Sequence, residues 1–353
     1  MKTGLETDAE TIAVRAGEEM EWDGLVAYLR PHLEGLPRDV QIRQFPGGHA
    51  NLTYLLSAGE KEWVVRRPPL GQLPKNAHDM VREYAVLSRL NAAYDRAPKA
   101  YHLCEDIDVI GAPFLVAERR RGVVLRRDWP ENFKVLDKLE ERISHALIDA
   151  LADLHLVDAE AIGLAGLGRP RGFAARQVKS WGERWYAAKD KELPVFDEVH
   201  GELIRQLPDS PRVSVLHNDF KLDNCMVDDG APDRITAVFD WDMATLGDPL
   251  IDLGTFFNYW PSEDGQFSWD KMPPFVTTTY PRRAELIARY GERTGFDVAG
   301  MNWYEAFALW KTAVVVQQIY IRYARGQTGD ERFATYGGYA EPLFEAARVL
   351  LAR

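Results

Sequence analysis

The sequence predicts an α+β fold made of two lobes, one built on a small antiparallel sheet and the other mostly helical. Three observations lead to this prediction. Apolar residues alternate along short amino-terminal segments, as in strands with one buried face. Beyond residue 122, apolar residues recur at helical spacing over long stretches. One short apolar hairpin, expected within 225–239, interrupts this helical part directly after a polar run.

The amino-terminal lobe is expected to hold a five-stranded antiparallel sheet and one helix, preceded by a capping helix. Leu25 and Leu29 share one face of the capping helix. Gly59 supplies the turn between the second and third strands, which makes the first three strands a meander. In order, we expect the capping helix at about 23–32, strands at 40–44, 52–56 and 63–66, a helix at 77–90, and strands at 99–104 and 113–118.

A charged segment of three arginines that ends in Gly122 is expected to cross between the lobes. No repeat or low-complexity tract indicates a further domain. The expected boundaries are 1–118 for the amino-terminal lobe, with a leader and the capping helix in 1–37, then 119–122 for the hinge and 123–353 for the carboxyl-terminal lobe. Helices of that second lobe are expected at 132–154, 173–189, 281–294, 303–324 and 339–351.

The composition predicts a soluble, cytoplasmic enzyme without an anchor or a signal peptide. The longest apolar runs fall far short of the roughly 20 residues that span a bilayer, and the segment 1–10 is acidic and polar. Cys104 and Cys225 lie on separate expected strands, which suits buried, reduced thiols. A net charge of −11 argues against broad nucleic-acid binding, whose affinity depends on Lys and Arg at phosphates.

A polar loop and the hairpin after it provide two candidate metal ligands. Asn224 precedes the first hairpin strand and Asp240 follows the second, so strand pairing is expected to bring them side by side. Their amide and carboxylate oxygens suit Mg²⁺, which fills its other positions with water and nucleotide phosphates. Asp219 lies on the same loop and is a candidate acceptor for a hydroxyl proton. This order of residues favours a metal-dependent phosphoryl-transfer site.

The run HNDFKLDN at 217–224 resembles the catalytic loop of protein kinases, and Asp240 stands where their metal-binding aspartate stands. The sequence is more similar to the aminoglycoside phosphotransferase and choline kinase-like family. The motifs that carry this similarity are Asp-Trp-Asp at 240–242, Gly-Asp-Pro at 247–249 and Asp-Leu at 252–253.

An upstream glycine pair narrows the resemblance to one branch of this family. Gly47-Gly48 and the Asn-Leu-Thr run at 51–53 look most like the branch that is also found fused to acyl-CoA dehydrogenases. The resemblance covers about 40–254. It implies a bilobal fold like that of protein kinases, with a catalytic β-hairpin in the helical lobe.

The resemblance also implies roles for residues of the loop. Asp219 is expected to act as the base or to orient the acceptor hydroxyl, and Asn224 and Asp240 to hold Mg²⁺. His217 is expected to be structural, with its ring bonded to the loop backbone. Lys221 matches a lysine of serine/threonine kinases and is expected to stabilise the transferring phosphoryl group; a plain surface lysine is the alternative.

The nucleotide site is expected in the amino-terminal lobe. Protein kinases place a lysine on the third strand and pair it with a helix glutamate, whereas this chain has arginine there, whose planar fork is not equivalent to an ammonium. Backbone N–H groups of a glycine turn can approach phosphate oxygens. The expected nucleotide-binding residues are Gly47, Gly48, Asn51, Arg66 with Glu83 as its partner, and Glu118 near the adenine.

Several other acidic and aromatic residues have a structural interpretation, and for some of them a functional one is also open. Asp242 is either a ligand of a second Mg²⁺ or a residue that holds its loop, while Asp248 and Asp252 are expected to cap and anchor the helix that begins near Pro249. A set of aromatic residues belongs either to the core or to an acceptor cleft: Trp181, Trp185, Tyr259, Trp260 and Tyr323.

The resemblance implies an ATP-dependent, or GTP-dependent, transfer of a phosphoryl group to a hydroxyl of a small molecule. The dehydrogenase-fused branch favours a hydroxyacyl acceptor, for which arginines at 119–121 or Arg322 and Arg325 offer positive charge. An aminoglycoside acceptor is the alternative. A nucleotide-binding pseudokinase is an alternative of another class, supported mainly by Arg66. The short spacing between Asp240 and Pro249 leaves little platform for a peptide and disfavours a protein kinase.

Overall fold

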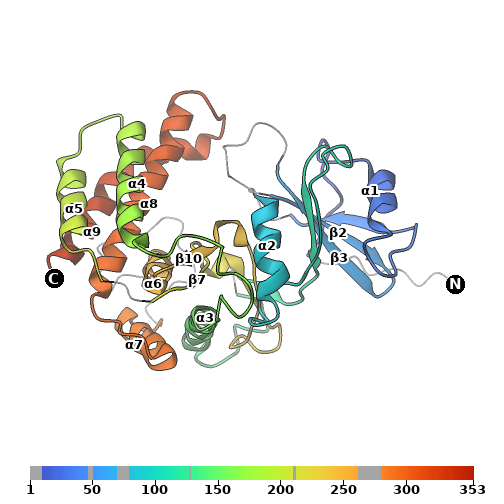
Figure 1. The fold of residues 1–353 in the computed structure, drawn as a ribbon, viewed down its shortest axis with the longest axis horizontal. Helices are drawn as coiled ribbons and strands as arrows, with labels where there is room; N and C mark the ends of the chain where they lie inside the picture. The colour runs from blue at the N-terminus through green and yellow to red at the C-terminus, as the bar shows by residue number, and fades with distance from the viewer. Residues whose placement is uncertain (1–9, 47–50, 70–78, 127–128, 210–211, 261–279) are drawn as a thin grey trace. The chain divides into compact units, whose positions relative to one another are not determined.

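The structure, a computed structural model, describes residues 10–46, 51–69, 79–126, 129–209, 212–260 and 280–353 (Figure 1). The chain forms two compact units. The first consists of Met1–Gly122 with Thr236–Ala244, and the second of Val123–Ile235 with Thr245–Arg353. The predicted α+β class is confirmed, because the first unit holds a five-stranded antiparallel sheet and the second is mostly helical.

The sheet of the first unit has the strand order β1-β2-β3-β5-β4, and each neighbouring pair is antiparallel. Its first three strands form the predicted meander. β5 then inserts between β3 and β4, so that β4 lies at an edge of the sheet. The strands are β1 (Gln41–Gln44), β2 (Leu52–Ala58), β3 (Lys61–Arg67), β4 (Ala100–Cys104) and β5 (Phe114–Glu118).

Successive side chains of a strand point to opposite faces of this sheet. Val65 and Val116 enter a hydrophobic core that the helix α1 (Trp22–Leu29) covers with its apolar side. Arg66, the next residue on β3, therefore lies on the other face, where α2 (Met80–Leu90) packs against β4 and β5. Figure 1 shows α1 and α2 on either side of the strands. The alternation thus places a charged strand residue beneath a helix.

A segment from much later in the sequence completes the first unit. Trp241 is fully buried there, donates from Nε1 to the carbonyl of Val238 at 2.8 Å, and meets the ring of Tyr94 edge-on. These contacts attach the neighbouring Asp240 to the first unit. The segment contains most of β9 (Ile235–Val238) and the 3₁₀ helix η2 (Trp241–Met243).

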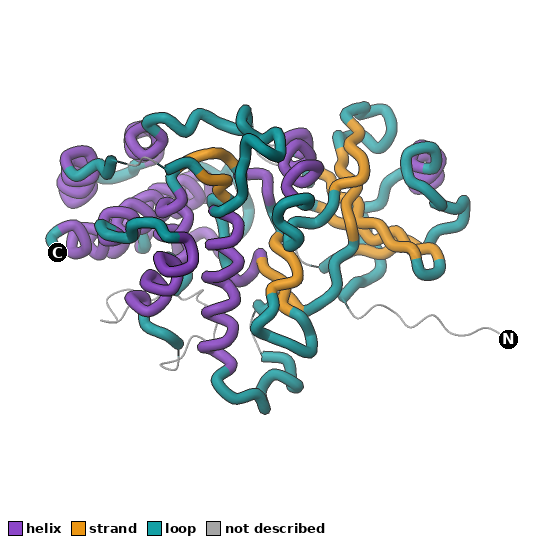
Figure 2. Tube along the Cα trace, turned by 60° about the horizontal axis from the view of Figure 1, so that its bottom comes forward, coloured by secondary structure: helices purple, strands orange, loops and turns teal. Residues whose placement is uncertain are grey.

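The second unit is dominated by helices, drawn in purple in Figure 2. The 24-residue helix α8 packs against α4, α6 and α9. The short strands β7 and β10 pair antiparallel, as do β6 and β8. Its helices are α3 (Leu139–His155), α4 (Phe173–Ala188), α5 (Pro194–Arg205), α6 (Pro249–Phe257), α7 (Arg283–Thr294), α8 (Met301–Ala324) and α9 (Ala340–Leu351), its strands β6 (Val123–Val124), β7 (Ser214–Leu216), β8 (Cys225–Val227) and β10 (Thr245–Gly247), and its 3₁₀ helices η1 (Leu222–Asn224) and η3 (Glu331–Gly338).

Two helices differ from the sequence-based expectation. The helix expected at 132–154 begins only at Leu139, because Lys138 adopts a left-handed conformation with φ of 51°. Val135, which lies before this break, is 83% exposed and does not pack. The sequence patterns did not predict α5, although Pro194 at its amino terminus is typical of a helix start.

Cys104 and Cys225 are both buried, as predicted, and no disulfide bond forms among the described residues. None of the helices in the described ranges is both long and apolar enough to cross a membrane.

Replacement of Trp241 by alanine is expected to destabilise the first unit by about 3–5 kcal/mol, because a fully buried indole leaves a cavity and a lost hydrogen bond. Urea unfolding measures this loss. Met243→Ala on the same short helix is the control, since Met243 is 46% exposed, and its effect should stay within about 0.5 kcal/mol. Equal effects of the two substitutions would contradict the packing role of Trp241.

Candidate functional site

The predicted site residues form two groups, one in each unit. In the first unit, Arg66 lies between two carboxylates. Its Nη1 is 2.8 Å from Oε1 of Glu83, and its Nη2 is 3.0 Å from Oδ1 of Asp240. The predicted pair of Arg66 with Glu83 is therefore present, and Asp240 is an additional partner. A planar guanidinium can bridge two carboxylates in this way, whereas an ammonium is a single point charge.

Burial determines the electrostatics of this group. Glu83 is only 1% exposed, and burial raises its pKa from 4.5 to about 7; Arg66 opposes this shift, while Asp240 and Asp242 add to it. Burial also opposes the charge of Arg66, but Glu83 and Asp240 outweigh it and raise the pKa of the guanidinium. One arginine thus contacts two carboxylates, and the charge of a third, Asp242, also acts on its pKa. This excess of negative charge favours a cation near Asp240.

The other predicted nucleotide-binding residues lie in the same unit. Asn51 is buried directly before β2. Glu118 ends β5, where its N–H donates to the carbonyl of Lys99 at 2.8 Å and its carboxylate accepts the N–H of Lys99 at 3.0 Å. The hydrogen-bonding groups of Glu118 are thus engaged with a neighbouring strand. Gly47 and Gly48 lie outside the described residues.

In the second unit, Asp219 lies on the loop between β7 and η1. Its Oδ2 accepts hydrogen bonds from Nζ of Lys221 at 2.7 Å and from Nδ2 of Asn224 at 3.0 Å. Its Oδ1 lies 3.4 Å from the hydroxyl of Tyr259, which is a long hydrogen bond. Oδ1 is therefore the more weakly bonded oxygen and the better placed to accept a proton.

The neighbours of Asp219 keep their own protons. Burial opposes the charge of Lys221, but Asp219, whose carboxylate lies 2.7 Å away, outweighs it and raises the pKa of the ammonium. Burial and the charge of Asp219 raise the pKa of the Tyr259 hydroxyl. Lys221 also lies over the ring of Tyr259, with Nζ 5.4 Å from the ring centre. Lys221 therefore remains a cation and Tyr259 a neutral hydrogen-bond donor at neutral pH.

Asn224 donates twice to Asp219, since its Nδ2 also lies 2.9 Å from the backbone carbonyl of that residue. With both amide hydrogens used, Oδ1 of Asn224 is the atom left for a metal ion. No group of three or more His, Cys, Asp or Glu side chains that could hold a metal occurs in the described ranges. The amide oxygen of Asn224 is a hard donor of the kind that Mg²⁺ binds.

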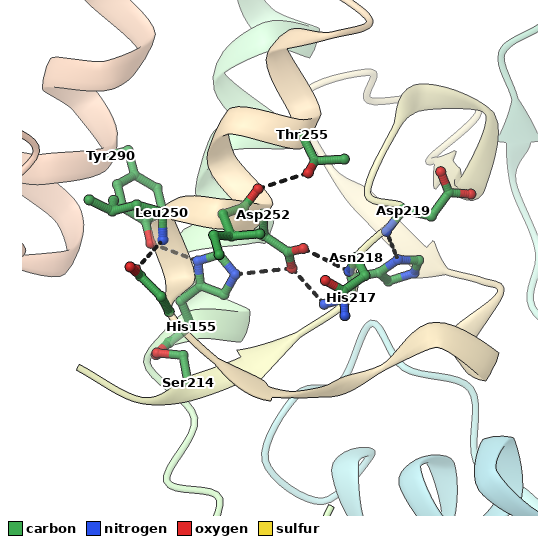
Figure 3. Close-up of polar contacts among 11 residues, drawn as sticks. His155, Ser214, His217, Asn218, Asp219, Leu250, Asp252, Thr255 and Tyr290 are labelled. Atoms are coloured by element: carbon green, nitrogen blue, oxygen red, sulfur yellow. Dashed lines mark hydrogen bonds and ion pairs between the residues drawn. The ribbon is translucent and has the colours of Figure 1, made fainter. Parts of the chain in front are cut away.

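Asp252 holds the backbone of this loop (Figure 3). This fully buried carboxylate on α6 accepts hydrogen bonds from the backbone N–H groups of His217 at 2.5 Å and Asn218 at 2.7 Å. Nε2 of His155, from α3, lies 3.3 Å from the same carboxylate, and the hydroxyl of Tyr290 lies 2.6 Å from its Nδ1. A carboxylate only accepts, so Nε2 carries the imidazole proton and Tyr290 donates to Nδ1.

This network explains the shape of the loop. Asn218 has φ of 66°, a left-handed conformation that persists only where the surroundings hold it. His217 accepts the N–H of Asp219 at Nδ1, at 3.3 Å, as predicted for a structural histidine. Burial alone would raise the pKa of Asp252, but hydrogen bonds from His155 and His217 hold it below 3.8. Asp248 caps α6 by accepting the N–H of Leu250, which confirms its predicted role.

The family model described as the phosphotransferase enzyme family matches residues 41–306. The chain belongs to this family. Among curated proteins, the acyl-CoA dehydrogenase family member 11 of Gallus gallus is 31% identical over 354 residues. That alignment covers 97% of this phosphotransferase chain but 45% of the relative, so the chain spans less than half of the relative's length.

Solved structures of similar proteins confirm the fold. A crystal structure from Ralstonia eutropha JMP134, provisionally described as an aminoglycoside phosphotransferase, matches at a TM-score of 0.81 and 29% identity, over 95% of this chain and 99% of that one. A thermostable mutant of aminoglycoside phosphotransferase APH(4)-Ia, in complex with AMP-PNP and hygromycin B, matches at 0.58 and 16% identity, over 89% and 94% of the two chains. The phosphotransferase fold predicted from the sequence is therefore confirmed.

Sequence reasoning missed several residues of this phosphotransferase chain that surround the loop. Tyr259 was one of five aromatic residues that the sequence allowed either in the core or in an acceptor cleft, and it contacts Asp219. The contacts of His155 with Asp252 and with Tyr290 could not be predicted from local patterns, because the partners lie 97 and 135 residues apart in the sequence. Trp181, Trp185 and Trp260 of the aromatic set are buried.

Replacement of Asp252 by asparagine is expected to lower the free energy of unfolding at pH 7 by about 3 kcal/mol, because one loop N–H loses its acceptor and a buried paired charge is removed. The pKa of Asp252 is lower in the folded than in the unfolded chain. The carboxylate therefore stabilises the fold above about pH 4, and this contribution is lost as pH falls through the folded pKa.

The difference between the wild type and Asp252→Asn should accordingly shrink when urea unfolding is repeated at about pH 3. Asp229→Asn, in an exposed turn of the same unit, is the control and should change little at either pH. A difference that is as large at pH 3 as at pH 7 would show that the charge of Asp252 is not what stabilises the loop.

Proposed function

We propose that this protein transfers the γ-phosphoryl group of ATP, or of GTP, to a hydroxyl of a small molecule. The observation that carries the proposal is the setting of Asp219. One carboxylate oxygen is held by Lys221 and Asn224, and the other has only a long contact to Tyr259. This arrangement fixes the carboxylate and leaves Oδ1 for the proton of an acceptor hydroxyl.

The chain's own residues then have separate tasks. Asp219 orients the acceptor hydroxyl for in-line attack and takes its proton at Oδ1, with no covalent enzyme intermediate. Lys221, whose ammonium is 2.7 Å from Asp219, places a positive charge where negative charge grows on the transferring group. Oδ1 of Asn224 and the carboxylate of Asp240 are the residues that would hold Mg²⁺, which when bound neutralises charge on the nucleotide phosphates.

Support for nucleotide binding comes from the first unit and from relatives. APH(4)-Ia has been solved with AMP-PNP and, in another complex, with ADP. Arg66 is charged and paired with Glu83, and it is proposed to contact the phosphate oxygens of a bound nucleotide. Backbone N–H groups of Gly47 and Gly48 are proposed to contact the phosphates, with Asn51 beside them. The adenine is proposed to bind backbone groups near Glu118.

The acceptor is proposed to be a hydroxyacyl compound. Several curated relatives are acyl-CoA dehydrogenase family members, whose name indicates that they handle acyl thioesters. An aminoglycoside acceptor is the alternative, because the solved relatives include a complex with hygromycin B. A pseudokinase is disfavoured, since the chain keeps an aspartate, an asparagine and a second aspartate at the three positions that catalysis needs: Asp219, Asn224 and Asp240.

Purified protein should consume ATP in a Mg²⁺-dependent manner when supplied with the right acceptor from a panel of hydroxy acids, hydroxyacyl-CoAs, sugars, amino alcohols and aminoglycosides. Asp219→Asn is expected to lower kcat by about 10²–10⁴-fold, because an amide does not accept the hydroxyl proton. Asp240→Asn should lower it as well, and Asp229→Asn should not. Wild-type rates in Asp219→Asn and Asp240→Asn would exclude the proposed mechanism.

Arg66→Lys is expected to raise the KM for ATP by about 10-fold and Arg66→Met by more, because an ammonium cannot contact Glu83 and phosphate oxygens as a planar fork does. Steady-state kinetics with varied ATP at saturating acceptor measures the change. Arg43, on β1 and bonded to Thr11, is the matched control for loss of a strand arginine. An unchanged KM in Arg66→Met would place the nucleotide phosphates elsewhere.

A further inference from the structure

Lys311 is a buried lysine for which the described residues provide no counter-ion. It lies on α8 and is only 8% exposed. Among the described residues, no carboxylate, carbonyl or hydroxyl forms a hydrogen bond or ion pair with its ammonium. Glu305, buried on the same helix, shows the usual solution, since it pairs with Arg283 at 2.5 Å. Burial of an unpaired ammonium is costly and disfavours the charged form of Lys311, so an anion bound beside it would stabilise the charge.

The surroundings of Lys311 are aromatic and positively charged. Its Nζ lies 5.6 Å from the ring centre of Trp181 on α4, and the guanidinium of Arg184 lies 4.3 Å from the same ring centre. No carboxylate pairs with Arg184 in the part of the chain that the structure describes. Two basic side chains therefore lie near the ring of Trp181, and no described carboxylate pairs with either of them, which is a suitable setting for an anion.

The charge of the proposed catalytic residue Asp219 also acts on Lys311. Burial lowers the pKa of Lys311, Asp252 and Asp219 act against this shift, and Arg184 adds to it. The helix α8 packs against both α4, which carries Trp181, and α6, whose end is followed by Tyr259. Lys311 thus belongs to the same part of the second unit as Asp219, yet the proposed phosphoryl transfer gives it no task.

Building on the proposed phosphotransferase activity, we propose that Lys311 binds an anionic group of the acceptor, a carboxylate or a phosphate, while Asp219 binds its hydroxyl. An acceptor with a negative charge would supply the counter-ion that Lys311 does not find among the described residues. A polycationic acceptor such as an aminoglycoside meets like charge at this position instead. An acidic acceptor is therefore expected to bind in preference to a basic one.

Other positive groups do not compete for this role equally well. The arginines at 119–121, which the sequence offered as a basic surface, each pair with a carboxylate of the first unit: Glu10, Glu118 and Glu62. Lys221 pairs with Asp219 itself. Among the described residues of the second unit, Lys311 is the buried cation that an incoming anion finds without displacing a partner.

The test uses a hydroxy acid, the diol and the amino alcohol of the same chain length, compared by kcat/KM on the full chain. The wild type should prefer the hydroxy acid to the diol by at least about 10-fold, which corresponds to about 1.4 kcal/mol, and should disfavour the amino alcohol. Lys311→Met, which keeps the length but not the charge, should remove this order and leave the KM for ATP unchanged. Lys311→Arg should restore part of it.

A second arm separates the two sources of negative charge. A hydroxyacyl thioester of coenzyme A is compared with the thioester of N-acetylcysteamine, which lacks the phosphates. A preference for the coenzyme A thioester that disappears in Lys311→Met assigns the phosphate, and a preference confined to the free hydroxy acid assigns the carboxylate. Preferences that survive unchanged in Lys311→Met overturn the proposal in either arm.

Binding and stability keep this inference separate from the proposed function. In calorimetry, the Asp219→Asn protein should bind the hydroxy acid more tightly than the diol, without turnover. This binding preference can be measured even if the protein catalyses no phosphoryl transfer. The melting temperature of Lys311→Met should be no lower than that of the wild type, whereas the loss of a lysine with a structural role would destabilise the protein. Lys179→Met, an exposed position on α4, is the control and should change neither binding nor melting.

Discussion

The buried carboxylate of Asp252 is the constraint on which the loop that carries Asp219 depends. It accepts two successive backbone N–H groups and is itself fixed by His155, so the loop has little freedom at His217 and Asn218. The left-handed conformation of Asn218 then turns the chain so that Asp219 reaches Lys221 and Asn224. The charge needed for this role persists because hydrogen bonds outweigh burial in setting its pKa.

Opposite charges balance differently at the two groups of site residues. Around Arg66 the carboxylates exceed the cations, and the buried Glu83 responds with a pKa near neutrality. Around Lys311 the cations exceed the carboxylates that contact them. In the functions proposed above, a metal ion would balance the first group and an anionic acceptor the second.

The sequence predicted the parts of the structure that follow from local patterns. Strand alternation placed Arg66 opposite the core, and the spacing of Asp219 and Asn224 marked the loop. Contacts that join distant segments were beyond local patterns: the 97-residue separation of His155 from Asp252, and the apolar helix in which Lys311 is embedded. The late start of α3 depends on the left-handed conformation of Lys138. The sequence does not predict this conformation, because it is uncommon for residues other than glycine.

The return of Thr236–Ala244 to the first unit has a consequence for synthesis of the chain. During translation, domains generally fold as they emerge from the ribosome, starting from the amino terminus. Here the strands β1 to β5 emerge early. Asp240, the partner of Arg66, and Trp241 emerge only after the helices α3, α4 and α5 of the second unit. Until this segment is synthesised, the pair of Arg66 and Glu83 lacks Asp240, so we expect the first unit to be completed late in the synthesis of the chain.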